Sequence, residues 1–211
     1  MTTRLIVWRH GNTDWNAGNR VQGQTDVPLN DLGRQQAVDA AELLVRMRPD
    51  ALVSSDLRRA ADTAAALAAL TGLSVTHDER LRERSFGLWQ GLTMAEVAET
   101  RPEEHARWAA GADVIGGEVE TLEDLGKRVA DALQAAADGV GPDGTVIVAT
   151  HGAAARSGVG HLLGWPREQL RTLRALQNCH WVELTHDTAR GWQIATYNVG
   201  PFSDRPVPPP V

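Results

Sequence analysis

The sequence is poor in the features that cross-linked, secreted or membrane-spanning proteins need. Its 211 residues include one cysteine, Cys179, so no disulfide can form within the chain, which fits a reducing compartment. Only four apolar residues precede Arg9, too few for a signal peptide, and no apolar run approaches the ~18 residues of a membrane span. We therefore expect a soluble, cytoplasmic protein without a membrane partner.

Positive charge is scarce as well. The net charge is −6 at pH 7, and Lys127 is the one lysine. A chain with this balance has no general affinity for nucleic acid or anionic membranes, so any anion that it binds must meet a local cluster of cations. The remaining composition, 42% hydrophobic and 23% charged, is that of an ordinary globular protein. We expect one domain over 1–200 and a proline-rich, disordered tail over 201–211.

Strand-like and helix-like segments alternate along the chain, which predicts an α/β fold with a mostly parallel sheet. The expected strands are the apolar runs at 5–8, 51–54, 73–76, 145–150, 180–184 and 192–196. The expected helices lie at 30–47, 56–72, 93–100 and 121–139, with one more directly after the strand at 145–150. We expect a loop from the end of the helix at 93–100 to Gly117.

Local signals predict details of three helices. Helical spacing places Val38 on the apolar face of the first helix. Asp56 is the expected N-cap of the second helix, and Gly72 is its expected end. Thr121, with an acid three residues later, is the expected start of a helix that ends at Gly139.

Two of the strands end in nearly the same way, one with "RHG" and the other with "THG". Ligands of such sheets bind beyond the carboxyl ends of the strands, and parallel strands would bring His10 and His151 to one edge. The glycines beside them, such as Gly152, let backbone N–H groups approach a ligand closely. A neutral imidazole can attack phosphorus, and the adjacent Arg9 would lower the histidine pKa and grip phosphate oxygens. The pattern therefore points to a phosphate.

Further cations should converge on this edge, because phosphoryl transfer depends mostly on positioning and charge stabilisation. Arg58 and Arg59 stand at the start of a predicted helix, where the helix N-terminus already favours anions. A guanidinium there can hold two phosphate oxygens, but the residues alone do not choose between the two arginines. The leaving oxygen also needs a proton, and Glu83 lies in a turn-rich segment between basic residues.

Taken singly, each of these residues has an ordinary structural explanation, as a polar strand end, a structural histidine, a solvated helix face or a surface carboxylate. Their joint occurrence at one strand edge favours a catalytic site. The other histidines lack metal-ligand spacing, and we expect no metal site. We assign structural or surface roles to His77, His105, His161, His180 and His186.

These motifs resemble the histidine phosphatase superfamily, also called the phosphoglycerate mutase-like family. The resemblance covers Leu5 to about Tyr197, with "RHGNTDWN", "QGQTDVPLNDLGRQQA", "SSDLRRAADTA", "LRERSFGLWQG", "GGE" and "ATHG" in the family's order. It implies a three-layer α/β/α sandwich of the phosphoglycerate mutase-like type. It also implies a nucleophile at His10, a proton donor at Glu83, and neither a metal nor another cofactor.

The resemblance adds residues that the bottom-up argument does not reach. It favours Arg59 over Arg58, because the family's arginine directly precedes the alanine of its motif. The implied phosphate-binding residues are Arg9, Asn16, Arg59, His151 and Gly152. The implied substrate-pocket residues are Gln22, Gly23, Phe86 and Met94.

Two activities share such a site, and the sequence favours one of them. Mutases of the family carry a tyrosine and a lysine that hold a substrate carboxylate, where this chain has Phe86 and Met94. The segment 92–116 also lacks the adjacent arginine pair of the mutases. Retained phosphoglycerate would lose these anchors, which favours hydrolysis.

We therefore expect a phosphatase acting on phosphate monoesters of sugar- or glycerate-like metabolites. The motifs are similar to a branch that includes actinobacterial glucosyl-3-phosphoglycerate phosphatases and broad-specificity phosphatases, so glucosyl-3-phosphoglycerate is one candidate substrate. A cofactor-dependent phosphoglycerate mutase and a non-catalytic phospholigand binder are the alternatives. The expected partner is a small phosphorylated metabolite and not nucleic acid. The sequence is compatible with a monomer or a homodimer.

Overall fold

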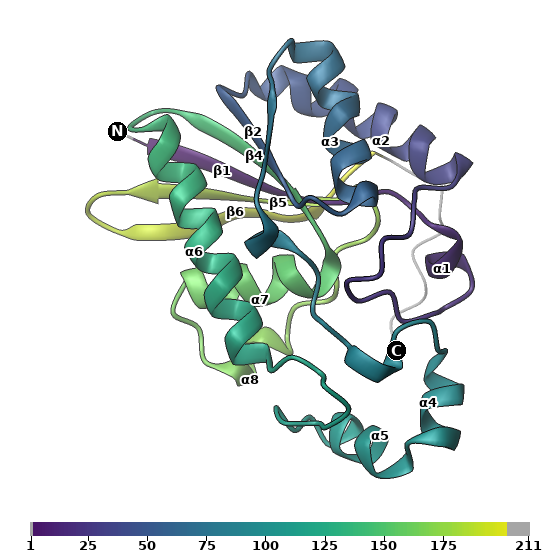
Figure 1. The fold of residues 1–211 in the computed structure, drawn as a ribbon. Coiled ribbons are helices and arrows are strands. Elements are labelled where there is room, and N and C mark those ends of the chain that lie inside the picture. The colour runs from purple at the N-terminus through teal and green to yellow at the C-terminus, as the bar shows by residue number, and fades with distance from the viewer. Residues whose placement is uncertain (1, 202–211) are drawn as a thin grey trace, which may run out of the picture.

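A six-stranded mixed sheet, in the order β3-β2-β4-β1-β5-β6, forms the middle layer of the protein (Figure 1). The computed structural model describes residues 2–201. The strands β3, β2, β4 and β1 are mutually parallel, whereas β5 runs antiparallel to both β1 and β6. The bounds of the strands are β1 (Thr2–Arg9), β2 (Ala51–Ser54), β3 (Val75–His77), β4 (Thr145–Thr150), β5 (Trp181–Asp187) and β6 (Gly191–Val199).

Helices cover both faces of this sheet, which confirms the predicted α/β/α sandwich (Figure 1). Alternate residues of β1 point to opposite layers, as strand geometry requires. Leu5 and Val7 pack with α6 and α7, whereas Ile6 and Trp8 pack with α2 and α3. The helices are α1 (Asp14–Ala17), α2 (Asp31–Leu44), α3 (Arg58–Thr71), α4 (Met94–Thr100), α5 (Pro102–Ala109), α6 (Leu122–Val140), α7 (Gly152–Leu162) and α8 (Arg167–Leu170), with short 3-10 turns η1 (Val45–Met47), η2 (Glu79–Leu81) and η3 (Gly87–Trp89).

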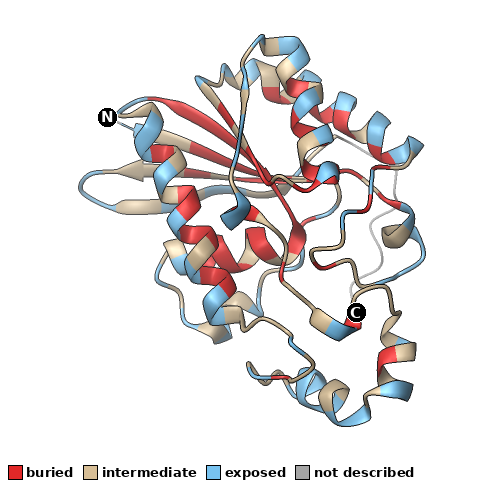
Figure 2. Cartoon of the chain, in the orientation of Figure 1, coloured by how far each residue is buried: buried red, intermediate tan, exposed pale blue. Residues whose placement is uncertain are grey.

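The buried strands at the centre of the sheet are the elements that the sequence predicts best. β2 and β4 have the predicted bounds, and every residue of β4 is buried (Figure 2). β3 lies at the edge of the sheet and is displaced from the predicted 73–76 to Val75–His77. The two antiparallel strands are longer than predicted. The tail predicted over 201–211 lies outside the described residues, apart from Pro201.

The buried face of α2 differs from the predicted one. Val38 is 46% exposed, whereas Ala37, Ala40, Ala41 and Leu44 are buried. These four residues follow the helical period and form one stripe against the sheet and α3. Because the stripe consists mostly of alanine, α2 can approach the alanine-rich α3 closely, and the bulkier Val38 lies to one side of it.

The N-terminus of α3 is capped by a residue that no local signal could identify. Asp56, the predicted N-cap, instead accepts a hydrogen bond from Arg82 Nε at 2.9 Å. Asp26 Oδ1 accepts from the backbone N–H of Arg58 at 2.8 Å and so satisfies the first turn of the helix. Gly72 ends the helix in the left-handed conformation, as predicted.

The segment after α4 holds a second helix where the prediction has a loop. α5 begins at Pro102, and proline is favoured at the first helical position because its φ is already helical. Thr121 caps α6 by accepting from the Asp124 backbone N–H at 3.0 Å, as predicted. The helix runs past Gly139, however, and its C-cap is Gly141. α4 and α5 lie away from the sheet in Figure 1, around a small core of Trp89, Val97 and Ile115.

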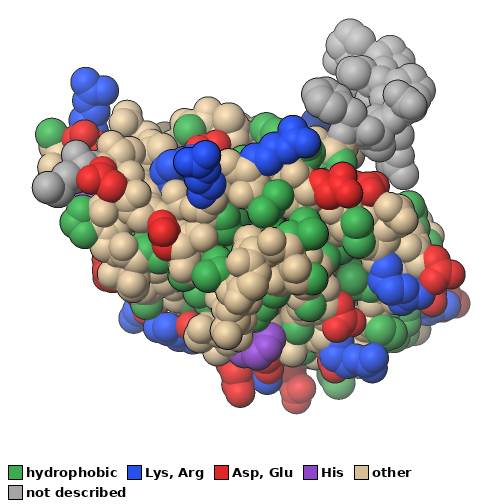
Figure 3. Space-filling view, turned by 90° about the horizontal axis from the view of Figure 1, so that it is seen from above, with side chains coloured by type: hydrophobic (Ala, Val, Ile, Leu, Met, Phe, Trp, Pro, Cys, Tyr) green, Lys and Arg blue, Asp and Glu red, His purple; other side chains and the backbone are tan. Residues whose placement is uncertain are grey.

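The surface carries charges of both signs. On the face shown in Figure 3, lysine and arginine side chains are interspersed with aspartate and glutamate among the described residues. Of the helices in residues 2–201, none has the length and apolar content needed to cross a bilayer.

Candidate active site

The carboxyl ends of β1 and β4 lie side by side and bring two histidines together. Arg9 pairs in register with Thr150, and the His10 backbone N–H donates to the Thr150 carbonyl at 3.0 Å. The His10 and His151 rings meet edge to face, with their centroids 5.1 Å apart. The predicted meeting of the two histidines at one sheet edge is confirmed.

His10 is held as a neutral imidazole. The residue is only 3% exposed, and its Nδ1 lies 2.7 Å from the Gly11 carbonyl oxygen. A carbonyl can only accept, so Nδ1 carries the proton and Nε2 keeps its lone pair. Burial, reinforced by the positive charges of Arg59 and Arg9, holds the pKa of His10 well below its usual value. The nitrogen that can attack phosphorus is therefore unprotonated at neutral pH.

Arg59 is a fully buried cation that connects three segments. Its Nε donates to His151 Nδ1 at 3.2 Å, Nη1 to the Thr25 carbonyl at 2.8 Å and Nη2 to the Gly23 carbonyl at 2.7 Å. Burial lowers the pKa of Arg59 to about 10, so the guanidinium still carries its charge at neutral pH. Arg58 is exposed, so the structure places Arg59 rather than Arg58 at the site.

His151 lies behind Arg59. Its Nδ1 accepts from Arg59, which leaves the proton on Nε2, and Nε2 lies 2.9 Å from Ser55 Oγ. Both ring nitrogens therefore have partners within the protein. Among the described residues that line the cavity beside His10, His151 is absent. In this arrangement His151 orients Arg59, and direct phosphate binding by His151 stays a prediction.

The Glu83 carboxylate sits at the N-terminus of α7. Oε1 accepts from the backbone N–H groups of Arg84 and Ala154 at 2.8 and 2.9 Å, and Oε2 accepts from that of Ala153 at 3.1 Å. The otherwise unpaired N–H groups of the helix thereby fix the orientation of the carboxylate. Oε2 has the smaller share of these bonds and keeps a lone pair for a ligand.

A cavity of about 210 Å³ joins these groups. It contains every predicted site residue except His151 and Gly152, and its lining is Arg9, His10, Asn16, Arg20, Val21, Gln22, Gly23, Arg59, Glu83, Phe86, Met94 and Trp108. Arg9 Nε and Gln22 Oε1 are buried without a hydrogen-bond partner in the described part of the chain. An unpaired buried polar atom costs about 1–3 kcal/mol, so the cavity favours a ligand that pairs with both.

Asn16 lines this cavity, and its side-chain oxygen is already hydrogen-bonded. Asn16 Oδ1 accepts from the backbone N–H and the hydroxyl of Thr13 at 3.2 and 3.1 Å, and from Asn178 Nδ2 at 3.4 Å. With the oxygen occupied, the nitrogen is left to donate. The capping box of α1 thus orients a residue that the family resemblance implies as a phosphate ligand.

Asn178 is a site residue that the sequence analysis does not include. Its Nδ2 also lies 3.0 Å from the His10 carbonyl oxygen and 3.1 Å from that of Gly11, so it holds the loop after β1. Asn178 precedes β5, and the antiparallel pairing of β5 with β1 brings it to this edge. Asn178 belongs to none of the sequence motifs. Only a correct prediction that β5 pairs with β1 could have placed it at this edge of the sheet.

Two glycines allow close packing around the strand ends. A Cβ atom at Gly11 would lie 2.4 Å from the Gly33 carbonyl oxygen, which excludes any other residue there without a backbone shift. A Cβ at Gly152 would make only ordinary contacts, 3.5 Å from Cζ and Nε of Arg9. Gly152 therefore lies against the Arg9 guanidinium, and its backbone contact with phosphate stays a prediction.

Comparisons with known proteins agree with this geometry. A sequence profile of the histidine phosphatase superfamily (branch 1) matches residues 5–200. The chain is 40% identical to a glucosyl-3-phosphoglycerate phosphatase of Mycolicibacterium vanbaalenii, over 92% of this chain and 94% of that protein. It is 40% identical to a metal-independent phosphoserine phosphatase of Arabidopsis thaliana, over 74% of this chain and 66% of that protein. A solved structure of mycobacterial glucosyl-3-phosphoglycerate phosphatase complexed with VO3 is 37% identical, with a TM-score of 0.86 over 94% of this chain and 100% of that one.

Replacing Arg59 should lower activity far more than replacing Arg58. We expect Arg59→Ala to reduce kcat on p-nitrophenyl phosphate about 10²–10³-fold, the loss typical of a preorganised charge stabiliser. Arg58→Ala, at the exposed neighbour, is the matched control and should stay close to wild type. Steady-state rates measure both effects, and circular dichroism checks that the variants fold. Equal losses, or the reverse order, would show that the arginine is misassigned.

The two buried histidines should make stability depend on pH. The pKa values of His10 and His151 in the fold are held well below the usual value by burial and by Arg59. Below about pH 6.5 the unfolded chain therefore binds protons that the native fold does not, and the free energy of unfolding must fall. The expected loss is up to ~1.4 kcal/mol per pH unit for each histidine.

Urea titrations in phosphate-free buffer, between about pH 7.5 and pH 5, measure this slope. His10→Gln should remove the share of the slope that His10 contributes. A variant with the same slope as wild type would show that His10 is not buried as a neutral group.

Proposed function

The chain belongs to the histidine phosphatase superfamily, and from that membership we propose that it hydrolyses phosphate monoesters of small metabolites through a phosphohistidine at His10. Two of its relatives are named for glucosyl-3-phosphoglycerate and phosphoserine. Sugar- and glycerate-like alcohols are accordingly the proposed substrate skeletons, with glucosyl-3-phosphoglycerate as one candidate.

One observation carries the proposal. The lone pair of a neutral, oriented imidazole shares a cavity with two guanidinium groups and one carboxylate, those of Arg9, Arg59 and Glu83. The imidazole is a nucleophile, the guanidinium groups attract a dianion, and the carboxylate can exchange a proton. A site that only bound phosphate would need the cations alone.

The first chemical step transfers the phosphoryl group to the protein. His10 Nε2 forms a bond to phosphorus while the bond from phosphorus to the alcohol oxygen breaks. Glu83, protonated at Oε2, gives its proton to that oxygen, so the substrate leaves as a neutral alcohol. Arg9, Arg59 and the Asn16 amide hold the three phosphoryl oxygens, whose charge must be stabilised in the transition state.

The second step returns the protein to its starting state. Glu83, now a carboxylate, takes a proton from water as the water oxygen attacks phosphorus. The bond from His10 Nε2 to phosphorus breaks, and inorganic phosphate leaves. The hydrogen bond from Nδ1 to the Gly11 carbonyl orients the ring through both steps.

A cofactor-dependent mutase is the second candidate, and two apolar side chains argue against it. Phe86 and Met94 line the cavity where mutases of the family present a hydroxyl and an ammonium group. A missing charge-assisted contact costs about 1.5–3 kcal/mol. A mutase must keep its alcohol bound while the alcohol reorients, whereas a hydrolase gains by releasing it to admit water.

The cellular setting is also a proposal. We place the activity in the cytoplasm, since Cys179 is the one cysteine and no disulfide can form within the chain, which fits a reducing compartment. The proposed partner is the phosphorylated metabolite alone, not nucleic acid or membrane, and a homodimer stays open.

Phosphate release from a panel of substrates tests the function. The protein, with and without EDTA, is mixed with p-nitrophenyl phosphate, phosphoserine, 3-phosphoglycerate or glucosyl-3-phosphoglycerate. We expect release at equal rates with and without EDTA, because arginines rather than a metal supply the charge. In a coupled enolase assay with added 2,3-bisphosphoglycerate, interconversion of phosphoglycerates should be slower than release.

His10→Ala is the matched control, and it should show no release while its circular dichroism spectrum stays native. Interconversion faster than phosphate release would make the chain a mutase. Tight binding of these compounds by wild type without release of phosphate would instead make it a non-catalytic binder.

A further inference from the structure

A second cavity, of about 250 Å³, adjoins the one that contains His10. The two cavities share Phe86 and Trp108 as lining residues. The second cavity is also lined by Arg84, the residue after Glu83, and by Ala153, whose backbone N–H holds the Glu83 carboxylate. The two cavities are therefore adjacent and share these two aromatic side chains as part of their walls.

Four arginines line this second cavity: Arg84, Arg156, Arg167 and Arg171. Arg84 is only 4% exposed, and its Nη2 atom is buried without a hydrogen-bond partner in residues 2–201. Its Nε is held by the Glu120 carbonyl at 2.7 Å, and its guanidinium lies over the Phe86 ring. A buried, oriented guanidinium with a free donor is a group that awaits an acceptor.

The other three arginines leave the cavity with excess positive charge. The Arg156 side chain makes no hydrogen bond or ion pair within the described part of the chain. Arg167 and Arg171 both donate to the Gly111 carbonyl, at 2.7 and 3.2 Å, although they carry like charges. The nearby acid Asp113 reaches Arg167 only at 3.7 Å.

Three acids, Asp113, Glu120 and Glu83, act on the charge of Arg84, but the Glu120 carboxylate is hydrogen-bonded to other residues. The Glu120 carboxylate accepts hydrogen bonds from Arg128 Nε at 2.6 Å and from the Ser85 backbone N–H at 2.9 Å. Among the described residues, the lining of this cavity thus holds four arginines and no acid, and Asp113 nearby forms an ion pair with Arg167 alone. Clustered guanidinium groups repel one another, so an anion that binds among them gains in free energy.

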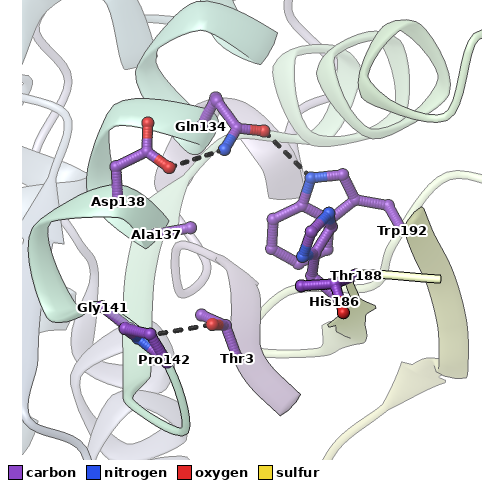
Figure 4. Close-up of a pocket in the computed structure, with 9 residues that line it drawn as sticks. All are labelled: Thr3, Gln134, Ala137, Asp138, Gly141, Pro142, His186, Thr188 and Trp192. Atoms are coloured by element: carbon purple, nitrogen blue, oxygen red, sulfur yellow. Dashed lines mark hydrogen bonds between the residues drawn. The ribbon is translucent and has the colours of Figure 1, made fainter. Parts of the chain in front are cut away.

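A cavity at the other end of the sheet, drawn in Figure 4, serves for comparison because hydrogen bonds join several of its lining residues. There, Gln134 accepts from Trp192 Nε1 at 3.0 Å and donates to Asp138 at 2.8 Å, and Thr3 donates to the Gly141 carbonyl at 3.1 Å. Gln134, Asp138, Trp192 and Thr3 all have hydrogen-bond partners there. By contrast, the three described side-chain atoms that are buried without a partner belong to Arg9, Gln22 and Arg84, residues that line the two adjoining cavities near His10.

We propose that the arginine-lined cavity binds a second anionic group of the substrate, a carboxylate or a phosphate remote from the phosphate that is cleaved. Phe86 and Trp108 would contact the carbon skeleton between the two anions. This inference rests on the proposed function and narrows its substrates to phosphate monoesters that carry a second negative charge. The arginines then supply the anion anchor that Phe86 and Met94 cannot.

Matched substrate pairs test this inference. 3-phosphoglycerate differs from glycerol 3-phosphate by a carboxylate, and fructose 1,6-bisphosphate differs from fructose 6-phosphate by a phosphate. We expect kcat/KM to be about tenfold or more higher for the member with the second anion, the ratio expected for one charge-assisted contact. The pair that shows the preference identifies the anion as carboxylate or phosphate.

Arg156→Gln is the variant of choice, because Arg156 holds no other residue in place. It should lower kcat/KM for the doubly charged substrate about tenfold, mainly through KM, and reduce the preference within the pair. Turnover of p-nitrophenyl phosphate, which has no second anion, should change far less. Arg190→Gln, at an exposed arginine in the turn after β5, is the control and should match wild type.

Binding measurements separate this inference from the proposed function. Calorimetry on His10→Ala protein, which cannot form the phosphohistidine, should give the same tenfold preference in Kd, and His10→Ala with Arg156→Gln should lose it. Turnover without a preference in either pair would overturn the second anion site and leave the phosphatase intact. A binding preference without wild-type turnover would overturn the phosphatase alone. An equal loss on p-nitrophenyl phosphate would make Arg156 a structural residue.

Discussion

The site depends on the buried cation Arg59, which forms no ion pair within residues 2–201, although Glu83 and Asp26 act on its charge from nearby. Arg59 is fully buried, and its charge is retained because the Gly23 and Thr25 carbonyls and His151 accept its hydrogen bonds. Removing such a cation from water costs several kcal/mol, which these dipoles offset only in part. Burial, reinforced by the charges of Arg59 and Arg9, lowers the pKa of His10 and keeps its imidazole neutral, and the same charges favour an anion in the cavity.

The helices contribute to the site by an indirect route. Helix N-termini favour anions, and the sequence suggests that the N-terminus of α3 would help to hold phosphate; the N-terminus of α7 also lies at the site. The protein's own carboxylates occupy both, Asp26 on α3 and Glu83 on α7. In the proposed function, arginine side chains and the Asn16 amide are therefore the groups that would bind phosphate. The N-terminus of α7 instead holds the Glu83 carboxylate within the cavity, where an acid and base of the reaction is needed.

Sequence alone predicted the central strands and the meeting of the two histidines, because buried strands have a local apolar signature and parallel strands end at one edge. It did not predict Asp26 as the cap of α3, Asn178 beside His10 or the arginine cluster around Arg84. Each depends on contacts between residues distant in sequence. Choosing Arg59 over Arg58 needed the family motif, since both precede the same helix, and only packing shows which one is buried.

The most direct test of the account is to trap the phosphorylated protein. In Glu83→Gln, p-nitrophenyl phosphate should still react, since its leaving group needs no proton, but water should attack slowly without a base. Rapid quenching should therefore give a burst of p-nitrophenol equal to the amount of protein. Mass spectrometry should find an acid-labile, base-stable phosphate on His10. A phosphate on another residue, or turnover without any phosphorylated protein, would contradict the account.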